Sequence, residues 1–273
     1  MRSCKRKNFD RAAPGRFFAT AALQNRVVAT GNERTLKKFR IGGIRNEAGG
    51  QIDVTYGHDD NKECTPTYVS GRDRWDSTKE CFAQQYADPN GTSDWEWFHK
   101  YVVTRIALGD AALGFKLGVA DDTDLGTLRV YDYEYRGTPA WRFNDSRHLP
   151  TSKETWNDWR GYGESLVHLR QARDDNSGVS GGTISITRTV RFRGLNQTIS
   201  APNVPQSGLQ IDTNEISNNT NEQKDQTWFA GRVAEVEKLT GNGDLIERTY
   251  TEYSATATAE DPDGINAKVI CPR

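Results

Sequence analysis

Cysteine is the residue type of this sequence whose chemistry and spacing are easiest to evaluate. There are four: Cys4, Cys64, Cys81 and Cys271. They form no C-x-x-C pair, and no Cys/His spacing matches a zinc site. Cys64 and Cys81 flank a loop rich in Asp, Gly, Ser and Thr, which a disulfide could close in an oxidising compartment. Because a sequence does not place the Cβ atoms, two free thiols remain the alternative. We expect a disulfide between Cys64 and Cys81.

The histidines are also few, and they are scattered along the chain: His58, His99, His148 and His168. No H-E-x-x-H or similar pairing relates them, although such a pairing would place two imidazoles on one face of a helix. His99 directly follows Trp97 and Phe98, which favours a packed, structural side chain over a base or a ligand. The histidine pattern therefore predicts structural roles and no metal ligand.

An acidic turn is the other candidate for ion binding. Asp121, Asp122 and Asp124 lie close together in the segment GVADDTDLG, and close carboxylates can hold calcium. The spacing lacks the distal Glu of an EF-hand, so we expect a solvated turn. The sequence has no G-x-S-x-G, and no Ser or Cys has an evident basic partner. We therefore expect no catalytic residue, no cofactor and no enzymatic activity.

The composition narrows the remaining function classes. Lysine and arginine together number 36 against 37 acidic residues, a net charge of −1, which gives no electrostatic basis for binding nucleic acid. No segment approaches the roughly 18–20 apolar residues of a membrane span. Residues 17–23 follow a basic start but lack a convincing cleavage site, so we expect no signal peptide in this chain. The start of the sequence is also compatible with an internal position in a longer reading frame.

The pattern of polar and apolar residues favours an all-β fold of successive antiparallel hairpins. Residues 35–56 alternate on both sides of a Gly-Gly turn, and residues 101–106 and 127–135 form a second candidate pair. Residues 183–192 alternate strictly, and residues 228–239 and 244–253 flank the turn Gly241-Asn242-Gly243. One or two short helical turns are expected, at residues 93–98 and near Thr151 or Ser152. No α/β alternation is present.

Four segments follow from these patterns. Residues 1–34 are poorly defined, and residues 35–195 form a β-rich domain. Residues 196–226 are rich in Asn, Gln, Ser and Thr, which is typical of a polar loop or linker. Residues 227–273 contain the last hairpin and an edge or frayed end.

Aromatic residues make up 10% of the chain, and two groups of them, tyrosines and tryptophans, recur in patterns that predict their structural positions. In residues 127–135 the tyrosines alternate, so Tyr131, Tyr133 and Tyr135 should form a row on one face of a strand. Tryptophans recur through the β-rich domain, as Trp95, Trp97, Trp141, Trp156 and Trp159. Exposed tryptophans would suit a carbohydrate-binding platform. We favour structural aromatics packed between hairpins, since such rings bury a large area each.

Several motifs, taken together and in order, resemble the region that leads into the repeat array of Rhs/YD-repeat proteins of actinobacteria. The resemblance covers most of the chain, from about Arg26 to Tyr253. The motifs are GGIRNEAGGQIDVTY (42–56), DWEWFHKYVVTRI (94–106), VYDYEYRGTPAWRF (130–143), WNDWRGYGE (156–164), TRTVRFRGL (187–195) and the hairpin-like FAGRVAEVEKLTGNGDLIERTYTEY (229–253).

This resemblance implies a non-catalytic structural role. Proteins of the family build a β-hairpin shell around a C-terminal domain, usually a toxin of the polymorphic type, and are secreted or displayed at the bacterial cell surface, where they act in bacterial competition. The implied partners are adjacent repeat hairpins of the same polypeptide and an enclosed toxin domain. The chain departs from the family in having no run of typical YD repeats, no self-cleavage motif and no toxin domain. A surface adhesin or carbohydrate-binding module is the alternative.

Overall fold

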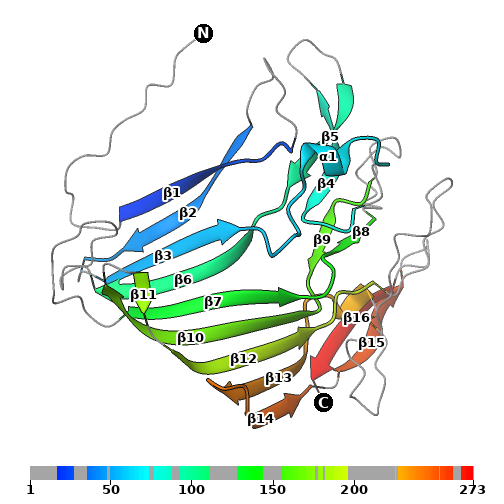
Figure 1. Cartoon of the computed structure of the whole chain (residues 1–273). Coiled ribbons are helices and arrows are strands. Elements are labelled where there is room, and N and C mark those ends of the chain that lie inside the picture. The colour runs from blue at the N-terminus through cyan, green and yellow to red at the C-terminus, as the bar shows by residue number, and fades with distance from the viewer. Residues whose placement is uncertain are drawn as a thin grey trace.

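The computed structural model describes the chain in segments (Figure 1). They are residues 17–27, 36–47, 50–73, 77–87, 93–110, 128–143, 155–175, 178–180, 182–195, 225, 227–251, 253–260 and 266–272. The acidic turn with Asp121, Asp122 and Asp124, the helical turn expected near Thr151, and His148 lie outside the described residues.

The main element is one large antiparallel sheet, which confirms the all-β fold predicted from the sequence. Its strands follow the order of the chain, apart from the elements that form small sheets of their own. In spatial order they are β1 (Phe17–Gln24), β2 (Lys37–Arg45), β3 (Gly50–Gly57), β6 (Val102–Asp110), β7 (Leu128–Arg136), β10 (Glu164–Asp175), β12 (Thr183–Arg191), β13 (Val233–Thr240) and β14 (Leu245–Tyr250), with β11 (Gly178–Ser180) paired to β10.

The strand pairs expected from alternation are present. β2 pairs with β3, β6 with β7, and β13 with β14, all antiparallel. The β2–β3 turn is closed by the Asn46 amide, which donates to the Gly50 carbonyl at 3.0 Å. Gly241 begins the β13–β14 turn, where an added Cβ would collide with the Thr183 carbonyl oxygen. Glycine is therefore required at position 241 by this close approach of two backbones.

Two inserted hairpins lie together at one end of the sheet, and we call them the cap. The first contains α1 (Pro66–Val69), β4 (Cys81–Ala87) and β5 (Ser93–His99), and the second contains β8 (Ala140–Arg142) and β9 (Asp158–Gly161). They follow β3 and β7, which end on the same side (Figure 1). The Trp141 indole donates to the Lys79 carbonyl at 2.9 Å, and its ring lies 5.2 Å from that of Phe82.

One local prediction was wrong. Residues 93–98 do not form a helical turn but lie in β5, where they pair across to β4. Aromatic side chains such as Trp97 and Phe98 favour a half-buried strand, and this packing outweighs the helix-capping potential of Ser93. The C-terminal part of the chain, expected to form an edge or a frayed end, contains a hairpin of β15 (Tyr253–Glu260) and β16 (Asn266–Pro272).

The helical turns lie elsewhere. α1 is capped by Thr65, whose hydroxyl accepts from the Tyr68 amide at 3.1 Å. A short 3-10 helix, η5, spans Thr227–Phe229.

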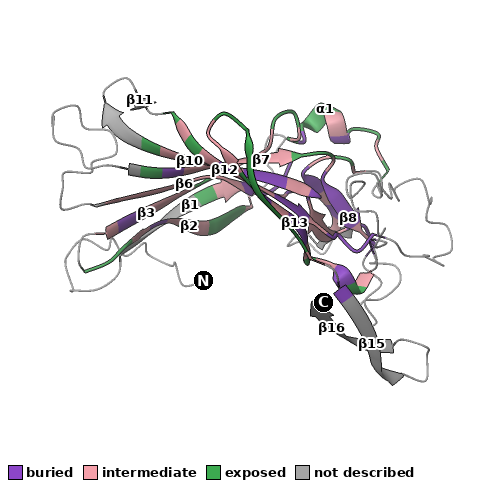
Figure 2. Cartoon of the chain, turned by 90° about the horizontal axis from the view of Figure 1, so that it is seen from below, coloured by how far each residue is buried: buried purple, intermediate pink, exposed green. Residues whose placement is uncertain are grey.

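Among the described residues, apolar side chains form several small clusters instead of one thick core. One joins Phe192, Phe229 and Tyr253, and another joins Trp141, Phe143 and Trp156. Figure 2 shows the buried residues gathered towards the cap end of the sheet, around β8 and β13. This distribution fits the low hydrophobic content of 35%, because many sheet positions are only half-buried.

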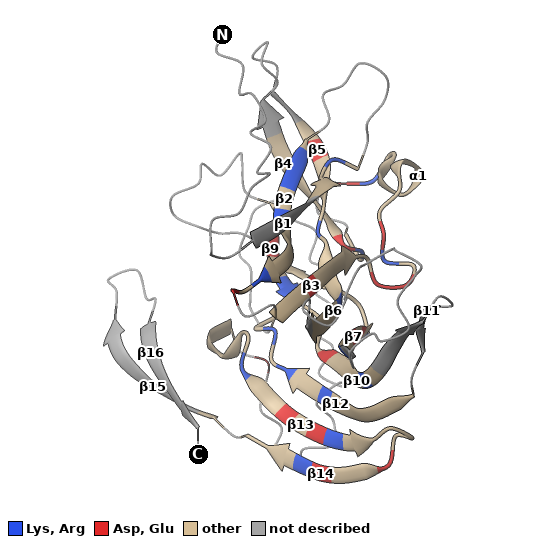
Figure 3. Ribbon diagram, turned by 90° about the vertical axis from the view of Figure 1, so that its left-hand side faces the viewer, with Lys and Arg blue, Asp and Glu red and all other residues tan. Residues whose placement is uncertain are grey.

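Charged side chains supply contacts between neighbouring strands of the sheet. Arg188 on β12 reaches Glu164 on β10 at 2.9 Å and Glu237 on β13 at 3.2 Å. Nearer the sheet's first strands, Asp132 pairs with Arg105 on β6 and with Arg170 on β10. Acidic and basic residues accordingly lie next to one another on β12, β13 and β14 in Figure 3. Opposite charges on adjacent strands stabilise a sheet and fix its register.

Candidate functional site

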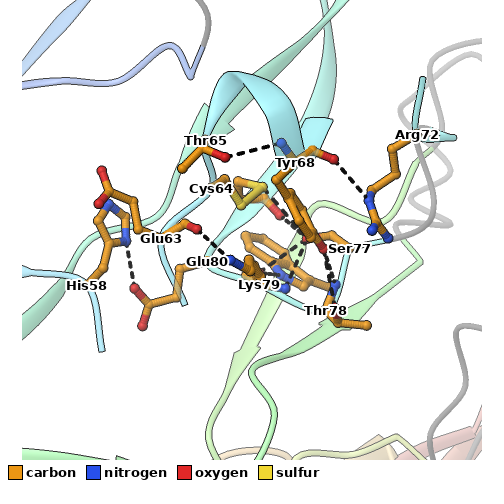
Figure 4. The surroundings of a disulfide bond; sticks show 12 residues. His58, Glu63, Cys64, Thr65, Tyr68, Arg72, Ser77, Thr78, Lys79 and Glu80 are labelled. Carbon is orange, nitrogen blue, oxygen red and sulfur yellow. Dashed lines mark hydrogen bonds and ion pairs between the residues drawn. A yellow bond between two sulfur atoms is a disulfide. The ribbon is translucent and has the colours of Figure 1, made fainter. Parts of the chain in front are cut away.

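Among the described residues, one unusual polar group is a carboxylate buried within the cap. Glu80, which precedes β4, is fully buried, with 0% of its surface exposed. His58, which follows β3, places its Nδ1 2.7 Å from Oε2 of Glu80 (Figure 4). A buried carboxylate is costly unless other groups compensate for its lost hydration, so this contact requires further partners.

Two further donors complete the surroundings of Glu80. The Tyr162 hydroxyl donates to Oε1 at 2.6 Å, and the backbone amide of Asp59 donates to Oε2 at 3.3 Å. Burial, followed by the hydrogen bond to Glu80, raises the pKa of Tyr162 far above its usual value. Tyr162 therefore remains a protonated donor at neutral pH. Two other segments of the chain, residues 58–59 and Tyr162, thus converge on the carboxyl group of Glu80.

A second histidine lies against the first. The rings of His58 and His99 have their centroids 5.0 Å apart, and Tyr101 contacts both rings, at 4.6 Å and 5.5 Å respectively. His99 is 8% exposed. Burial, and to a lesser extent the proximity of His58, lowers the pKa of His99 to about 4. Its imidazole is therefore neutral at pH 7, with one ring nitrogen carrying a free electron pair.

Both imidazoles have a nitrogen that is buried without a hydrogen-bond partner. These atoms are Nε2 of His58 and Nδ1 of His99. The exposed carboxylate of Glu63 lies beside them, and one ligand atom from each of His58, Glu63 and His99 lies within 4.8 Å of the others. Figure 4 shows the His58 ring between the carboxyl groups of Glu63 and Glu80. We call His58, Glu63, Glu80 and His99 the histidine cluster.

A disulfide holds this cluster in place. Cys64 and Cys81, the pair predicted from the sequence, are bonded in the structure, with Cα atoms 6.1 Å apart. Glu63 directly precedes Cys64, and Glu80 directly precedes Cys81. The bond therefore fixes the two carboxylate-bearing backbones of the cluster relative to each other. Val27 and Val69 pack with the two cysteines in a small buried group.

A pocket of about 290 Å³ adjoins the cluster on the side of the sheet. Tyr101 and Tyr162 line the pocket and also contact residues of the histidine cluster, and Trp159 adds an aromatic wall. Arg160 and Arg191 bring positive charge to the lining. A pocket with aromatic walls and a few polar groups is a general feature of small-molecule binding sites.

The aromatic residues singled out from the sequence occupy mostly packed positions. Trp141 and Trp156 are 6% and 3% exposed. Trp159 stacks edge-on against Trp141 at 4.8 Å, and Trp97 packs against the buried disulfide group. Trp95 on β5, and Tyr131 and Tyr133 on β7, are half-buried. The tyrosine row continues across the sheet, since Tyr133 stacks with Tyr135 at 6.4 Å and Tyr135 stacks with Tyr162 at 4.9 Å.

Sequence reasoning did not find the histidine cluster. It treated His58 and His99 as scattered, because the two residues are far apart in the chain and belong to no recognisable spacing. The neighbouring cysteines were the available indication, since a disulfide between Cys64 and Cys81 must also bring Glu63 and Glu80 together. The third histidine among those described, His168, lies on β10 and contacts Glu134 at 3.2 Å.

Comparison with known proteins adds no assignment to this geometry. No family model matches the sequence, and no curated protein matches it. Among the described residues, no helix combines the length and the apolar character needed to cross a membrane.

Proposed function

We propose that this chain is a non-catalytic structural segment of a large secreted Rhs/YD-repeat protein, and that its sheet forms part of a β-shell that encloses or presents a C-terminal toxin domain. The observation that carries the proposal is the sheet itself. Its strands follow one another in chain order and end at β14, whose six residues are all exposed. A shell can grow by adding successive hairpins to such an edge.

The exposed apolar side chains of β14 support pairing of this edge with a further strand. Leu245, Ile246 and Tyr250 are 52%, 65% and 43% exposed. A sheet edge presents unpaired backbone donors and acceptors, and exposed apolar side chains beside it favour association with another strand. The proposed partner is an adjacent repeat hairpin of the same longer polypeptide.

The way the sheet is stabilised also suits a thin wall. Cross-strand ion pairs such as Arg188–Glu164 and Arg105–Asp132 connect neighbouring strands without requiring a second apolar layer. A sheet face that carries such ion pairs can remain exposed to water, whereas an apolar face would need to be covered.

The test uses the association of the chain through β14. Light scattering over a concentration series should show oligomers that grow with the concentration of the wild-type chain. The substitution Ile246→Lys should reduce this association, because charged side chains on edge strands oppose edge-to-edge pairing. Ile184→Lys is the matched control, since Ile184 is 51% exposed but lies on β12, inside the sheet.

The results separate the shell from an autonomous module. Association that Ile246→Lys reduces and Ile184→Lys does not supports an adhesive edge at β14. A wild-type chain that remains monomeric at every concentration, with one sharp unfolding transition, would count against the shell proposal.

The pocket favours one alternative function, a carbohydrate-binding or adhesin module. Trp159 and the tyrosines of the pocket could stack on a sugar ring, while Arg160 and Arg191 could bind hydroxyl or acidic groups. A glycan array with the soluble chain tests this. Binding to one glycan class that Arg191→Gln abolishes would favour the carbohydrate-binding module. An array without any binding would contradict this alternative.

A further inference from the structure

The histidine cluster has the donor atoms of a transition-metal site. Two imidazole nitrogens and one carboxylate oxygen, from His58, His99 and Glu63, lie within 4.8 Å of one another. Imidazole nitrogen is a preferred ligand of zinc and related divalent metals, whereas calcium and magnesium prefer oxygen ligands only. Two nitrogens and one oxygen are also a ligand combination that zinc sites use.

The unsatisfied nitrogens are an independent indication. Nε2 of His58 and Nδ1 of His99 are buried and have no hydrogen-bond partner. The His58 side chain is 9% exposed, and His99 is 8% exposed, so water has little access to either ring. Buried polar atoms without partners are costly, and two of them in adjacent rings require a common explanation. A metal ion between the rings would supply a partner to both.

Glu80 provides the outer contact that such a site needs. Metal-binding histidines usually donate their second ring N–H to a carboxylate, which fixes the tautomer and the orientation of the ring. The 2.7 Å contact between Nδ1 of His58 and Oε2 of Glu80 has this form, and it leaves Nε2 as the free nitrogen. Glu80 is itself held by Tyr162 at 2.6 Å.

We propose that His58, His99 and Glu63 form a binding site for one divalent transition-metal ion of the zinc class, with Glu80 as the positioning residue for His58. Three protein ligands leave one position of a tetrahedral zinc ion for water or for an anion. The site is independent of the shell function, because its residues lie in the cap and not at the β14 edge.

The test is metal binding by the full chain with its disulfide intact. Free thiols are first alkylated without reductant, so that Cys4 and Cys271 cannot bind metal, and the protein is treated with EDTA. Calorimetric titration with Zn²⁺ should then show one ion per chain. Titration with Co²⁺ should produce the visible absorption of a four-coordinate ion with nitrogen and oxygen ligands.

Variants assign the site to these residues. His99→Gln should abolish the binding, and Glu63→Gln should weaken it by about tenfold or more, comparable with the loss of a supporting group in known metal sites. His168→Gln and Glu47→Gln are the matched controls, because both replace the same residue types outside the cluster, and they should bind as the wild type does. Glu63 is exposed, so Glu63→Gln should fold normally and keeps the test decisive even if His99→Gln does not fold.

Three results would overturn the proposal. The first is the absence of stoichiometric Zn²⁺ binding to the wild-type chain. The second is binding that Glu63→Gln and the folded His99→Gln leave unchanged. The third is a preference for Ca²⁺ over Zn²⁺, which would contradict the assigned metal class. Association through β14 is measured separately by light scattering. Failure of the metal-site proposal therefore does not decide the shell proposal, and failure of the shell proposal does not decide the metal site.

Discussion

Cys81 lies directly opposite His99 in the β4–β5 hairpin. The disulfide therefore connects the loop that carries Glu63 to the strand that pairs with His99. Because His99 is fixed by strand pairing and Glu63 by the covalent bond, two parts of the cap that are distant in sequence form one unit. The stability of the cap and the geometry of the histidine cluster should depend on the same bond.

The first prediction concerns this disulfide. Replacing both cysteines, as Cys64→Ser with Cys81→Ser, should lower the free energy of unfolding by about 3 kcal/mol, since the bond closes a sequence separation of 17 residues. Chemical denaturation with and without reductant measures the change. The wild-type chain should lose stability on reduction, and the double variant should not respond.

The same material tests whether the bond forms. Non-reducing mass spectrometry of protein made in an oxidising compartment should find Cys64 linked to Cys81. Two free thiols at these positions would contradict both the bridge and the expectation of secretion.

The second prediction concerns Arg188, which lies between three carboxylates. Its guanidinium contacts Glu164, Glu235 and Glu237, whose side chains are 14%, 11% and 7% exposed. Arg188→Ala should destabilise the protein by about 2 kcal/mol, because it removes a cation shared by three poorly hydrated carboxylates. The loss is partial, since Arg136 still contacts Glu164 and Arg248 still contacts the other two carboxylates. Urea denaturation measures the loss.

Lys238 provides the control for Arg188. It pairs with Glu247, but the two side chains are 61% and 54% exposed, so solvent screens the interaction. Lys238→Ala should cost less than about 1 kcal/mol. Equal effects of the two substitutions would show that the arginine network contributes no more than an ordinary surface pair.

The third prediction concerns alkaline pH and Tyr135. Burial, with a smaller effect of Tyr133, raises the pKa of Tyr135 from 10.0 to about 12, and its hydroxyl donates to the Val103 carbonyl at 2.8 Å. Below pH 10 this hydroxyl is protonated in both the folded and the unfolded chain. Between pH 10 and 12 the unfolded chain releases the proton first, so the contribution of Tyr135 to stability is lost as pH rises through this window.

Comparison with Tyr135→Phe isolates this contribution. The free energy of unfolding should fall more steeply between pH 10 and 12 for the wild type than for the variant, which has no hydroxyl to titrate. The measurement is denaturant unfolding at several pH values, with tyrosinate absorption as a second readout. Parallel pH profiles would contradict a partly buried Tyr135 that stays protonated in the folded chain up to about pH 12.

Local sequence patterns determined much of the sheet. Alternation in residues 35–56, 127–135 and 244–253 predicted strands that are present as β2 with β3, β7 and β14. Alternation succeeds because the side chains of a strand point to opposite faces in turn, so a half-buried sheet imposes its pattern on neighbouring residues. The same reasoning failed for residues 93–98. There a capping residue was visible in the sequence, whereas the pairing partner in β4 was not.

Only the tertiary structure decided the histidine cluster. The sequence by itself provided an all-β chain, a candidate pair of cysteines and aromatic residues suited to packing. The proximity of His58 and His99 could not be predicted from the sequence, because it depends on how the cap hairpin packs against the end of β3. Contacts between distant residues arise from strand register and from the packing of the cap, and neither leaves a fixed spacing in the chain.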